Sequence, residues 1–402
     1  MRKAALGSLL LSLATGCGPG DHSVGHTVRD SAGVIIVQNH EAVPADGGGW
    51  GLAANPSLVL GSPDESEDSG LYRVRGALRL PDGRVAVGSD GSSQVRIYGP
   101  DGILIKNLGR AGEGPGEFSS VILAGLRSDS LVAFDRRLRR VSLLHPDEGH
   151  SRSFTIAEPV AVLPIAGWFF ESGSVLIEDF PTADEGAVED GFNRYRARLK
   201  SCDMSGALIS DFGDLPGEEA FLATRQTEDG PASEFLTVPF GKSPQIAVAG
   251  DRLFFSSQDR YEISVFDSGG SLRTIVRLDR DPVPVTDAGV ALLIEQELTK
   301  YYENEVPGLR REFDRMPRVE FQPAHGAITA DREGYLFVED FRAPGMELVA
   351  VSVFDPAGLL VGRFEVPAAI EILEIGPDYL LALYDDPMEV EYVRLYELTR
   401  PG

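Results

Sequence analysis

The chain has 402 residues, 43% of them hydrophobic, and a formal net charge of −25 at pH 7. A chain of this length and apolar content can bury a large core. So negative a surface repels phosphate backbones and anionic lipid headgroups, which excludes nucleic acid as a partner. The carboxylates form either a solvated acidic exterior or a surface that attracts cationic partners or Ca²⁺.

The N-terminal residues are typical of a secretory leader. A positive start and an apolar run over residues 6–14, too short for a permanent membrane helix, precede Cys17. The Thr-Gly pair before Cys17 resembles the lipobox of bacterial lipoproteins, although Ala14 stands where that family usually carries Leu. The resemblance implies a signal peptide over residues 1–16 and lipidation of Cys17. An ordinary cleaved leader is the alternative, and residues 17–29 predict a flexible tether in either case.

Strands and turns follow from residue 30 onward. Residues 78–87 form a hairpin pattern around Asp82-Gly83, and residues 95–105 form a second one around Asp101-Gly102. Asp-Gly between alternating apolar residues is a strong hairpin signal. Two linked hairpins make one four-stranded antiparallel blade.

A short strand motif, two apolar residues flanking a variable one and then a bulky residue, recurs six times. The copies lie at 95–98, 141–144, 199–202, 263–266, 351–354 and 393–396. Such a unit must stack on its neighbours to bury its apolar face, so six copies predict an all-β, six-bladed propeller over residues 30–402. In four copies a glycine follows four places later, which predicts a turn with positive φ: Gly102, Gly206, Gly270 and Gly358.

The two cysteines predict no internal disulfide. If Cys17 carries lipid, Cys202 has no partner in the chain. Cys202 also occupies the bulky position of the third motif copy. We therefore interpret it as a small core hydrophobe and not as a nucleophile.

The last blade lacks its outer strand, because the chain stops at Gly402 soon after the sixth copy. An N-terminal strand must supply it. Residues 34–37, which follow an Asp-Ser-Ala-Gly turn, are the predicted closing strand. Residues 58–60 are the rival for the same position.

The longest interval between motif copies contains the one convincing helix pattern, over residues 286–306. Thr286 is a suitable N-cap, apolar residues then recur at helical spacing, and Pro307-Gly308 is expected to end the helix, with a further turn over 309–313. The insertion is interpreted as a lid or brace on one face of the ring, with a partner-binding helix as the alternative. The acidic segment 214–229 predicts an exposed loop.

A family resemblance rests on the segment Gly-Glu-Gly-Pro-Gly-Glu-Phe at residues 112–118. It resembles the signature between blades of NHL-repeat propellers, and the chain as a whole resembles bacterial six-bladed β-propeller lipoproteins related to them. That resemblance implies an architecture and a place in the cell envelope, but no particular reaction. The glycines are not a phosphate loop, because no Lys-Ser/Thr pair or helix start follows them.

Candidate ligand-binding residues come from polar positions near the starts of the innermost strands, since propellers bind ligands over the central channel. Five residues meet this criterion: Arg73, Arg75, His325, Glu371 and Glu374. A structural role is the alternative for each.

Enzymatic propellers provide further patterns to compare. Of the six histidines only His325 falls on an expected inner strand, so the three-ligand zinc site of amidating lyases is not predicted. Gluconolactonase-like propellers hold Ca²⁺ with Glu, Asp and Asn, and asparagine is scarce here, which weakens the Ca²⁺ interpretation without removing it. No Gly-x-Ser-x-Gly elbow supports a serine nucleophile. No catalytic or metal-binding residue is assigned.

The sequence thus predicts a monomeric, lipid-anchored propeller of the bacterial envelope, at the outer membrane because Gly18 and not Asp follows Cys17. Its expected role is that of a binding or scaffold module for a protein, peptide or carbohydrate, touching the membrane through its anchor alone. One alternative is a divalent-metal-dependent hydrolase, lactonase or lyase acting over the channel. Another is an interaction subunit of a transporter or protease.

Overall fold

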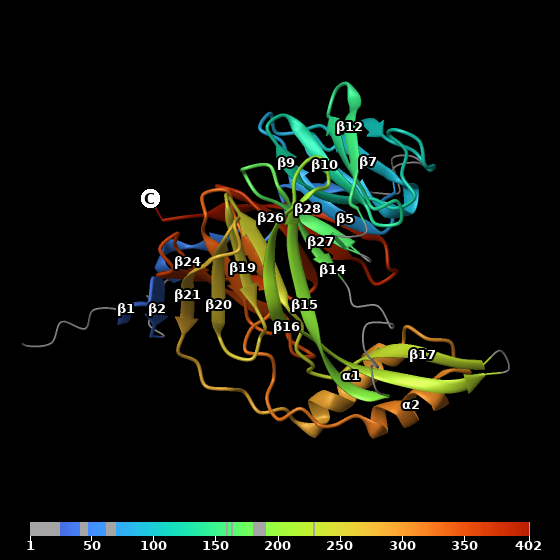
Figure 1. The fold of residues 1–402 in the computed structure, drawn as a ribbon, viewed down its shortest axis with the longest axis vertical. Helices are drawn as coiled ribbons and strands as arrows, with labels where there is room; N and C mark the ends of the chain where they lie inside the picture. The colour runs from blue at the N-terminus through green and yellow to red at the C-terminus, as the bar shows by residue number, and fades with distance from the viewer. Residues whose placement is uncertain are drawn as a thin grey trace, which may run out of the picture.

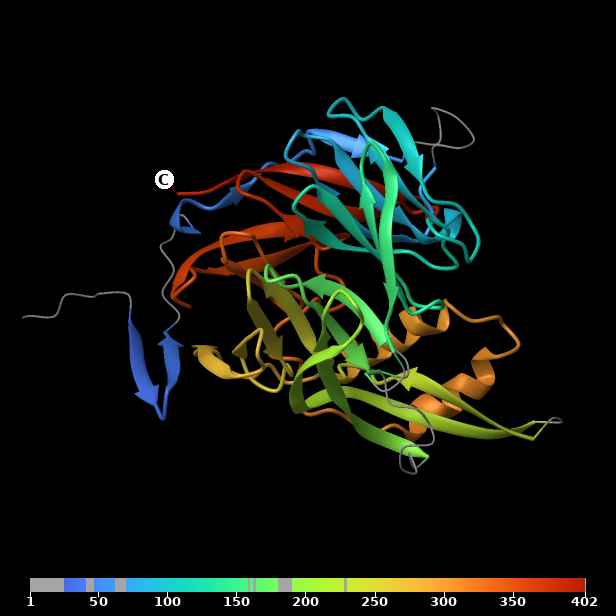
Figure 2. The same cartoon turned by 45° about the horizontal axis from the view of Figure 1, so that its top comes forward.

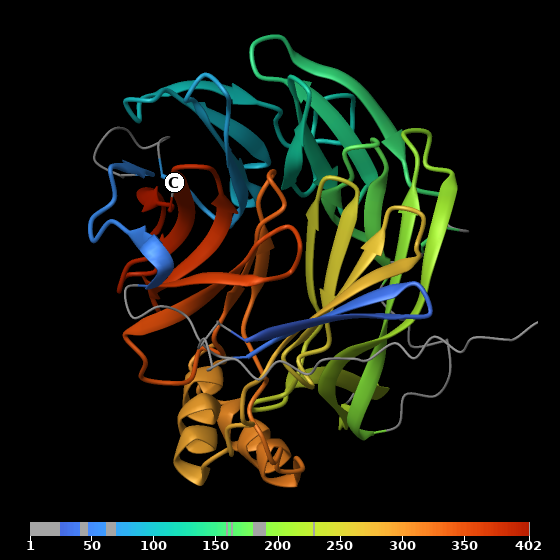
Figure 3. The same cartoon turned by 90° about the vertical axis from the view of Figure 1, so that its left-hand side faces the viewer.

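Six β-sheets follow one another along the chain and are arranged around a common centre, which makes the fold a six-bladed β-propeller (Figure 3). The computed structural model describes residues 25–40, 47–61, 70–157, 160–161, 164–179, 190–227 and 230–401. The leader, Cys17 and residues 17–24 of the expected tether lie outside the described residues. The predicted all-β propeller is confirmed.

The first three blades each begin with their innermost strand. The first blade contains β5 (Val74–Arg79), β6 (Val85–Ser89), β7 (Gln94–Tyr98) and β8 (Leu104–Leu108). The second contains β9 (Ile122–Arg127), β10 (Ser130–Asp135), β11 (Arg140–His145) and β12 (Gly149–Thr155). The third contains β13 (Pro164–Phe169), β14 (Val175–Asp179), β15 (Gly191–Cys202), β16 (Leu208–Thr227) and β17 (Gly230–Thr237).

The other three blades draw on both ends of the chain. The fourth contains β18 (Gln245–Ala249), β19 (Arg252–Ser256), β20 (Glu262–Asp267) and β21 (Leu272–Leu278), extended by β2 (Val34–Asn39) and β1 (His26–Ser31). The fifth contains β22 (Ile328–Ala330), β23 (Leu336–Glu339), β24 (Leu348–Phe354) and β25 (Leu360–Pro367). The sixth contains β26 (Ile370–Ile375), β27 (Tyr379–Asp385) and β28 (Glu391–Thr399), paired with β3 (Gly51–Leu52) and β4 (Leu58–Leu60).

The recurring strand motif is the third strand of its blade in all six cases, namely β7, β11, β15, β20, β24 and β28. The glycines predicted to need positive φ have it, with φ of 84° at Gly102 and 85° at Gly206, Gly270 and Gly358. An aspartate starts three of these turns and holds them closed. Asp355 Oδ1, for example, accepts the backbone N–H of Ala357 and of Leu359, each at 2.9 Å.

The core consists of six apolar seams, one between each pair of neighbouring blades. The seam between the sixth and first blades contains Leu60, Val85, Tyr98, Leu381 and Val393, all buried. A seam of this kind at the junction of the first and last blades means that the ring is closed. Cys202 lies in the seam between the second and third blades, where burial raises its thiol pKa to about 12, as expected of a core hydrophobe.

The closing strand is not the one that the sequence favoured. Leu60 pairs with Val393, and Leu58 with Leu395, so the rival segment β4 closes the sixth blade beside β28. The segment 34–37 instead belongs to β2, which pairs in parallel with β21 on the outside of the fourth blade (Figure 2). Turn chemistry alone could not distinguish the two, because both segments are short and apolar. The hairpin partner β1 also takes in His26–Ser31, so strand structure begins inside the expected tether.

The helical insertion is present where predicted, but its first helix ends at Leu298 and not near residue 306, and the expected further turn is a full second helix. The insertion sits beside an extended part of the third blade. It contains α1 (Asp287–Leu298), capped by the Thr286 hydroxyl, and α2 (Val306–Arg315). Pro307 lies in the first turn of the second helix, where a missing N–H is tolerated, and the first helix has already ended at Leu298. Phe221 and Leu236 of the third blade pack against Leu298, Leu309 and Phe313 of the helices.

The acidic segment 214–229 is not an exposed loop where the structure describes it. It continues β16 to Thr227, and β16 pairs with β15 and β17. We call the outer part of these three strands the ribbon: residues 191–196 of β15, 216–227 of β16, and β17. Figure 1 shows the ribbon projecting from the ring with the two helices against one of its faces. The insertion therefore braces the ribbon.

Candidate functional site

The two faces of the ring differ in construction. The innermost strands begin at one face, at Val74, Ile122, Pro164, Gln245, Ile328 and Ile370. We call this the loop face, because the connections between blades lie there. The opposite face carries the tight turns and is called the turn face.

Two of the predicted ligand residues, Arg75 and Glu371, meet at the loop face. They lie on β5 and β26, the innermost strands of the first and sixth blades, and both are exposed. The pKa of the Glu371 carboxyl is raised by its loss of hydrating water, an effect that Arg342 and Arg75 oppose. Arg342 is itself committed to Glu339, with Nη2 to Oε2 at 2.6 Å. The structure thus brings Arg75 and Glu371 together at the mouth of the ring.

Arg73 lies near this pair but has a structural partner. Its backbone has φ of 55°, and its Nη2 lies 3.2 Å from Asp90 Oδ2. The other carboxylate oxygen of Asp90 accepts the Val121 N–H at 2.9 Å, which ties the first blade to the start of the second. Arg73 therefore helps to hold a loop in place.

His325 is not on the surface of the channel. It is fully buried, its Nε2 lies 2.7 Å from the Ser256 hydroxyl, and its Nδ1 donates to the Gly326 carbonyl at 2.8 Å. Burial lowers its pKa to about 4, so the ring is neutral at pH 7. Both ring nitrogens are satisfied by the fold, as in a structural core histidine.

Glu374 lies at the other end of its strand, near the turn face, and is thereby separated from Glu371. Its Oε2 accepts the Arg79 N–H at 2.7 Å and the Tyr379 hydroxyl at 2.9 Å, and its Oε1 lies 3.3 Å from Arg332. These groups line a cavity of about 440 Å³. Because every oxygen of Glu374 already has a partner, this carboxylate links the sixth blade to the first.

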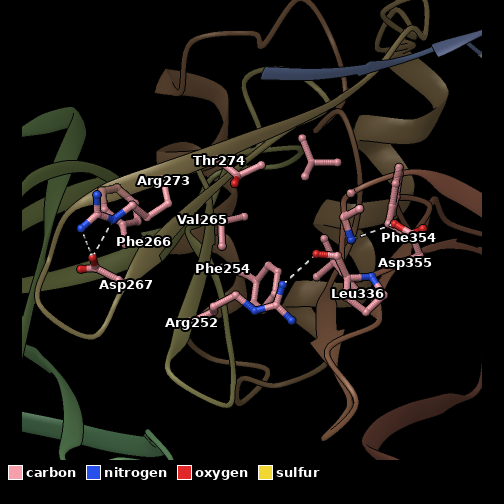
Figure 4. A pocket seen from close by; sticks show the side chains of 14 residues that line it. Arg252, Phe254, Val265, Phe266, Asp267, Arg273, Thr274, Leu336, Phe354 and Asp355 are labelled. Atoms are coloured by element: carbon pink, nitrogen blue, oxygen red, sulfur yellow. Dashed lines mark hydrogen bonds and ion pairs between the residues drawn. The ribbon is translucent and has the colours of Figure 1, made fainter. Parts of the chain in front are cut away.

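A second cavity on the turn face is a gap between two blades (Figure 4). It encloses about 100 Å³ between the fourth and fifth blades, with walls that include Phe254, Val265 and Phe354. Its polar groups are paired at the rim: Arg252 donates to the Pro356 carbonyl at 2.9 Å, and Arg273 to Asp267 at 2.7 Å. We interpret it as imperfect packing at a seam.

The cavity with unsatisfied chemistry lies at the loop face of the third blade, between the blade and the ribbon. It has a volume of about 280 Å³. We call it the ribbon pocket. Its lining includes Glu178 of β14, Tyr195 of β15, Glu218 of β16, and Phe235 and Thr237 of β17.

Two carboxyl groups in the ribbon pocket lack partners. Glu178 and Glu218 form no hydrogen bond or ion pair with any residue that the structure describes. Burial, and then the charge of Glu218, raises the pKa of Glu178 to about 7, and burial also raises the pKa of Glu218. At neutral pH the Glu178 carboxyl is therefore partly protonated, unlike an exposed carboxylate.

Glu219, the next residue on the same strand, has partners for both of its carboxylate oxygens. Glu219 Oε1 lies 2.6 Å from Arg194 Nη1, and its Oε2 accepts the Lys242 N–H at 2.9 Å. Alternate residues of a strand point to opposite faces. Glu219 is thus bound into one side of the ribbon, while Glu218 is directed into the ribbon pocket.

An aromatic pair forms the outer wall. The rings of Tyr195 and Phe235 lie 5.6 Å apart at 76°, in an edge-to-face arrangement, and Phe235 remains 58% exposed. The Tyr195 hydroxyl is buried and has no hydrogen-bond partner among the residues that the structure describes, and burial raises its pKa above the ordinary value. Arg196 also lines the pocket, but its guanidinium is paired with Asp214.

Sequence reasoning missed this pocket for a physical reason. Glu218 lies in a segment whose many acidic residues made it look like a solvated loop, and Glu178 ends an ordinary second strand. The available signal was the apolar alternation of Phe221, Ala223 and Leu236, which marks a strand with a buried face.

Comparisons with known proteins show likeness of fold only. No protein-family model and no curated protein matches the sequence. A member of the DUF4221 family from Bacteroides vulgatus has a TM-score of 0.49 at 10% identity, covering 88% of this chain and 99% of that chain. A Bacteroides fragilis protein assigned as exported has a TM-score of 0.48 at 14% identity, covering 92% and 100% of the two chains.

An enzyme is among the similar structures as well. Virginiamycin B lyase from Staphylococcus aureus has a TM-score of 0.39 at 14% identity, covering 86% of this chain and 98% of that chain. At these identities the comparisons say nothing about activity, and the six-bladed assignment here rests on the strand pairing itself.

The described residues contain neither a metal-binding cluster nor a membrane-spanning helix. Within the described ranges, no three His, Cys, Asp or Glu side chains gather closely enough to hold a metal ion. No described helix has the length and apolarity needed to cross a bilayer.

Proposed function

We propose that this protein is a lipid-anchored propeller of the bacterial envelope that acts as a binding module, holding a protein or peptide segment in the ribbon pocket. The leader and Cys17 support export and anchoring, and the NHL-like segment at 112–118 supports the relation to envelope propellers. The observation that carries the binding role is the ribbon pocket itself. Its Tyr195 hydroxyl is buried and its two carboxyl groups are half-buried, and none of the three has a hydrogen-bond or ion-pair partner among the described residues.

Polar groups without partners favour a ligand in the ribbon pocket. A buried polar group without a hydrogen bond costs about 1–3 kcal/mol, and more if it is charged. Two helices, α1 and α2, pack against the ribbon that forms the pocket wall. A bound segment that supplies donors to Glu178, Glu218 and Tyr195 would recover part of that cost.

The test fills the pocket without disturbing the core. Thr237 is exposed and lines the ribbon pocket, so Thr237→Trp should occupy it while the fold persists. Leu208→Trp, at the opposite end of β16 and 51% exposed, is the matched control. Proteins from native envelopes are captured on wild type and on both variants.

We expect a protein retained by wild type and by Leu208→Trp to be lost from Thr237→Trp, with all three melting within about 2 °C of one another. Equal retention by all three would place the binding surface elsewhere and contradict the proposal.

A further inference from the structure

Resting on the proposed function, we infer that the ribbon pocket recognises a primary ammonium group, in nature the side chain of a lysine on the bound protein or peptide. The inference concerns the class of ligand, which the shape of the ring leaves open. It depends on the charge, the donor count and the aromatic wall of the pocket, taken in turn.

The two carboxylates of the ribbon pocket favour a cationic ligand. Glu178 and Glu218 line one cavity, and the charge of Glu218 raises the pKa of Glu178, while the guanidinium of Arg196 is already engaged by Asp214. A neutral sugar would leave both carboxylates uncompensated in a partly dehydrated site, which is unfavourable. A bound cation would offset both charges.

The donor count fits an ammonium group in particular. The three unpartnered groups, from Glu178, Glu218 and Tyr195, come from three neighbouring strands, β14, β15 and β16. An ammonium carries three rotatable N–H donors, whereas a guanidinium is planar and prefers a single coplanar carboxylate. Separate acceptors on separate strands therefore suit lysine better than arginine.

The aromatic wall suits the rest of a lysine side chain. Tyr195 and Phe235 present an apolar surface at the entrance, with Phe235 open to solvent. The methylene stem of lysine packs on such surfaces while its head is held by charge, and an aromatic face attracts the ammonium.

Binding should be coupled to a proton. The titratable groups that line the pocket with Glu178 are Glu218, Asp179, Tyr195 and Arg196. An ammonium that enters between the two glutamates displaces the proton that Glu178 retains near neutrality. Affinity for the ammonium should therefore rise as pH increases from 6 to 8.

The experiment measures binding of Nα-acetyl-lysine methylamide by calorimetry or NMR titration on the intact protein. Its Nε-acetylated form is the neutral control probe, and CaCl₂ is titrated separately. The variants are Glu178→Gln, Glu218→Gln and Thr237→Trp, with Glu365→Gln, an exposed carboxylate on β25, as the matched control. We expect binding of the lysine probe only, at least tenfold weaker in either pocket glutamine variant and unchanged in Glu365→Gln.

Each other outcome contradicts the inference in a recognisable way. Equal binding of the two lysine probes would exclude recognition of charge, and Ca²⁺ binding lost in the same variants would make the pocket a metal site. The lysine probe could fail to bind while Thr237→Trp still loses the captured partner. That result would overturn the ligand class and leave the proposed function standing. Lysine binding unaffected by Thr237→Trp would overturn the location.

Discussion

Individual residues in this propeller divide into those that the fold satisfies and those that it leaves without partners. His325, Glu374 and Arg73 were predicted as ligand residues from their place near inner strands. The polar atoms of His325 and Glu374 are bonded within the fold, and the half-exposed Arg73 pairs with Asp90. Glu178 and Glu218 were not predicted, and neither has a partner in the described chain. The proposed binding site therefore rests on polar groups without partners and not on a residue's place along its strand.

The raised pKa of Glu178 leads to a prediction about stability. Its ordinary value near 4.5 rises to about 7 in the fold, so between these limits the folded protein binds more protons than the unfolded chain. Stability must therefore fall as pH rises through that window. Because the group is partly hydrated, we expect a loss of about 1–3 kcal/mol.

The variant Glu178→Gln mimics the protonated form and tests this directly. Chemical denaturation should find it about as stable as wild type at pH 5 and about 1–3 kcal/mol more stable at pH 8. If the difference in unfolding free energy between wild type and variant does not change with pH, the raised pKa of Glu178 is contradicted.

At the scale of elements, local pattern predicted the strands well and their partners less well. The six motif copies became six equivalent strands because alternation and Asp-Gly turns are local properties. The choice between residues 34–37 and 58–60 as closing strand was decided by tertiary packing, where Leu60 fits the seam against Val393. The ribbon was missed because its acidic side chains hide a strand whose apolar face is covered only once α1 and α2 are present.

The closing strand can be tested by a matched pair of substitutions. Leu60 is 2% exposed and Val59, beside it on β4, is 44% exposed. Leu60→Ala should lower the free energy of unfolding by about 2–4 kcal/mol, because it leaves a cavity in the closing seam. Val59→Ala should change it by less than about 0.5 kcal/mol. Equal effects in denaturant titrations would mean that β4 does not close the ring.

On the scale of the whole molecule, the ring closed by six seams is a rigid support. The ribbon and its two helices are added to the loop face at the third blade only, so that edge differs from the other five. The six-bladed architecture could be predicted because the repeat number determines it. The ribbon pocket could not, since it joins residues from four strands of one blade whose approach depends on an insertion far along the chain.

The most direct measurement is a crystal structure of the protein bound to Nα-acetyl-lysine methylamide. We expect the ammonium between the Glu178 and Glu218 carboxylates, within hydrogen-bond distance of both, with the methylenes against Tyr195 or Phe235. A probe bound instead at the channel mouth beside Glu371, or an ordered metal ion between the two glutamates, would contradict it.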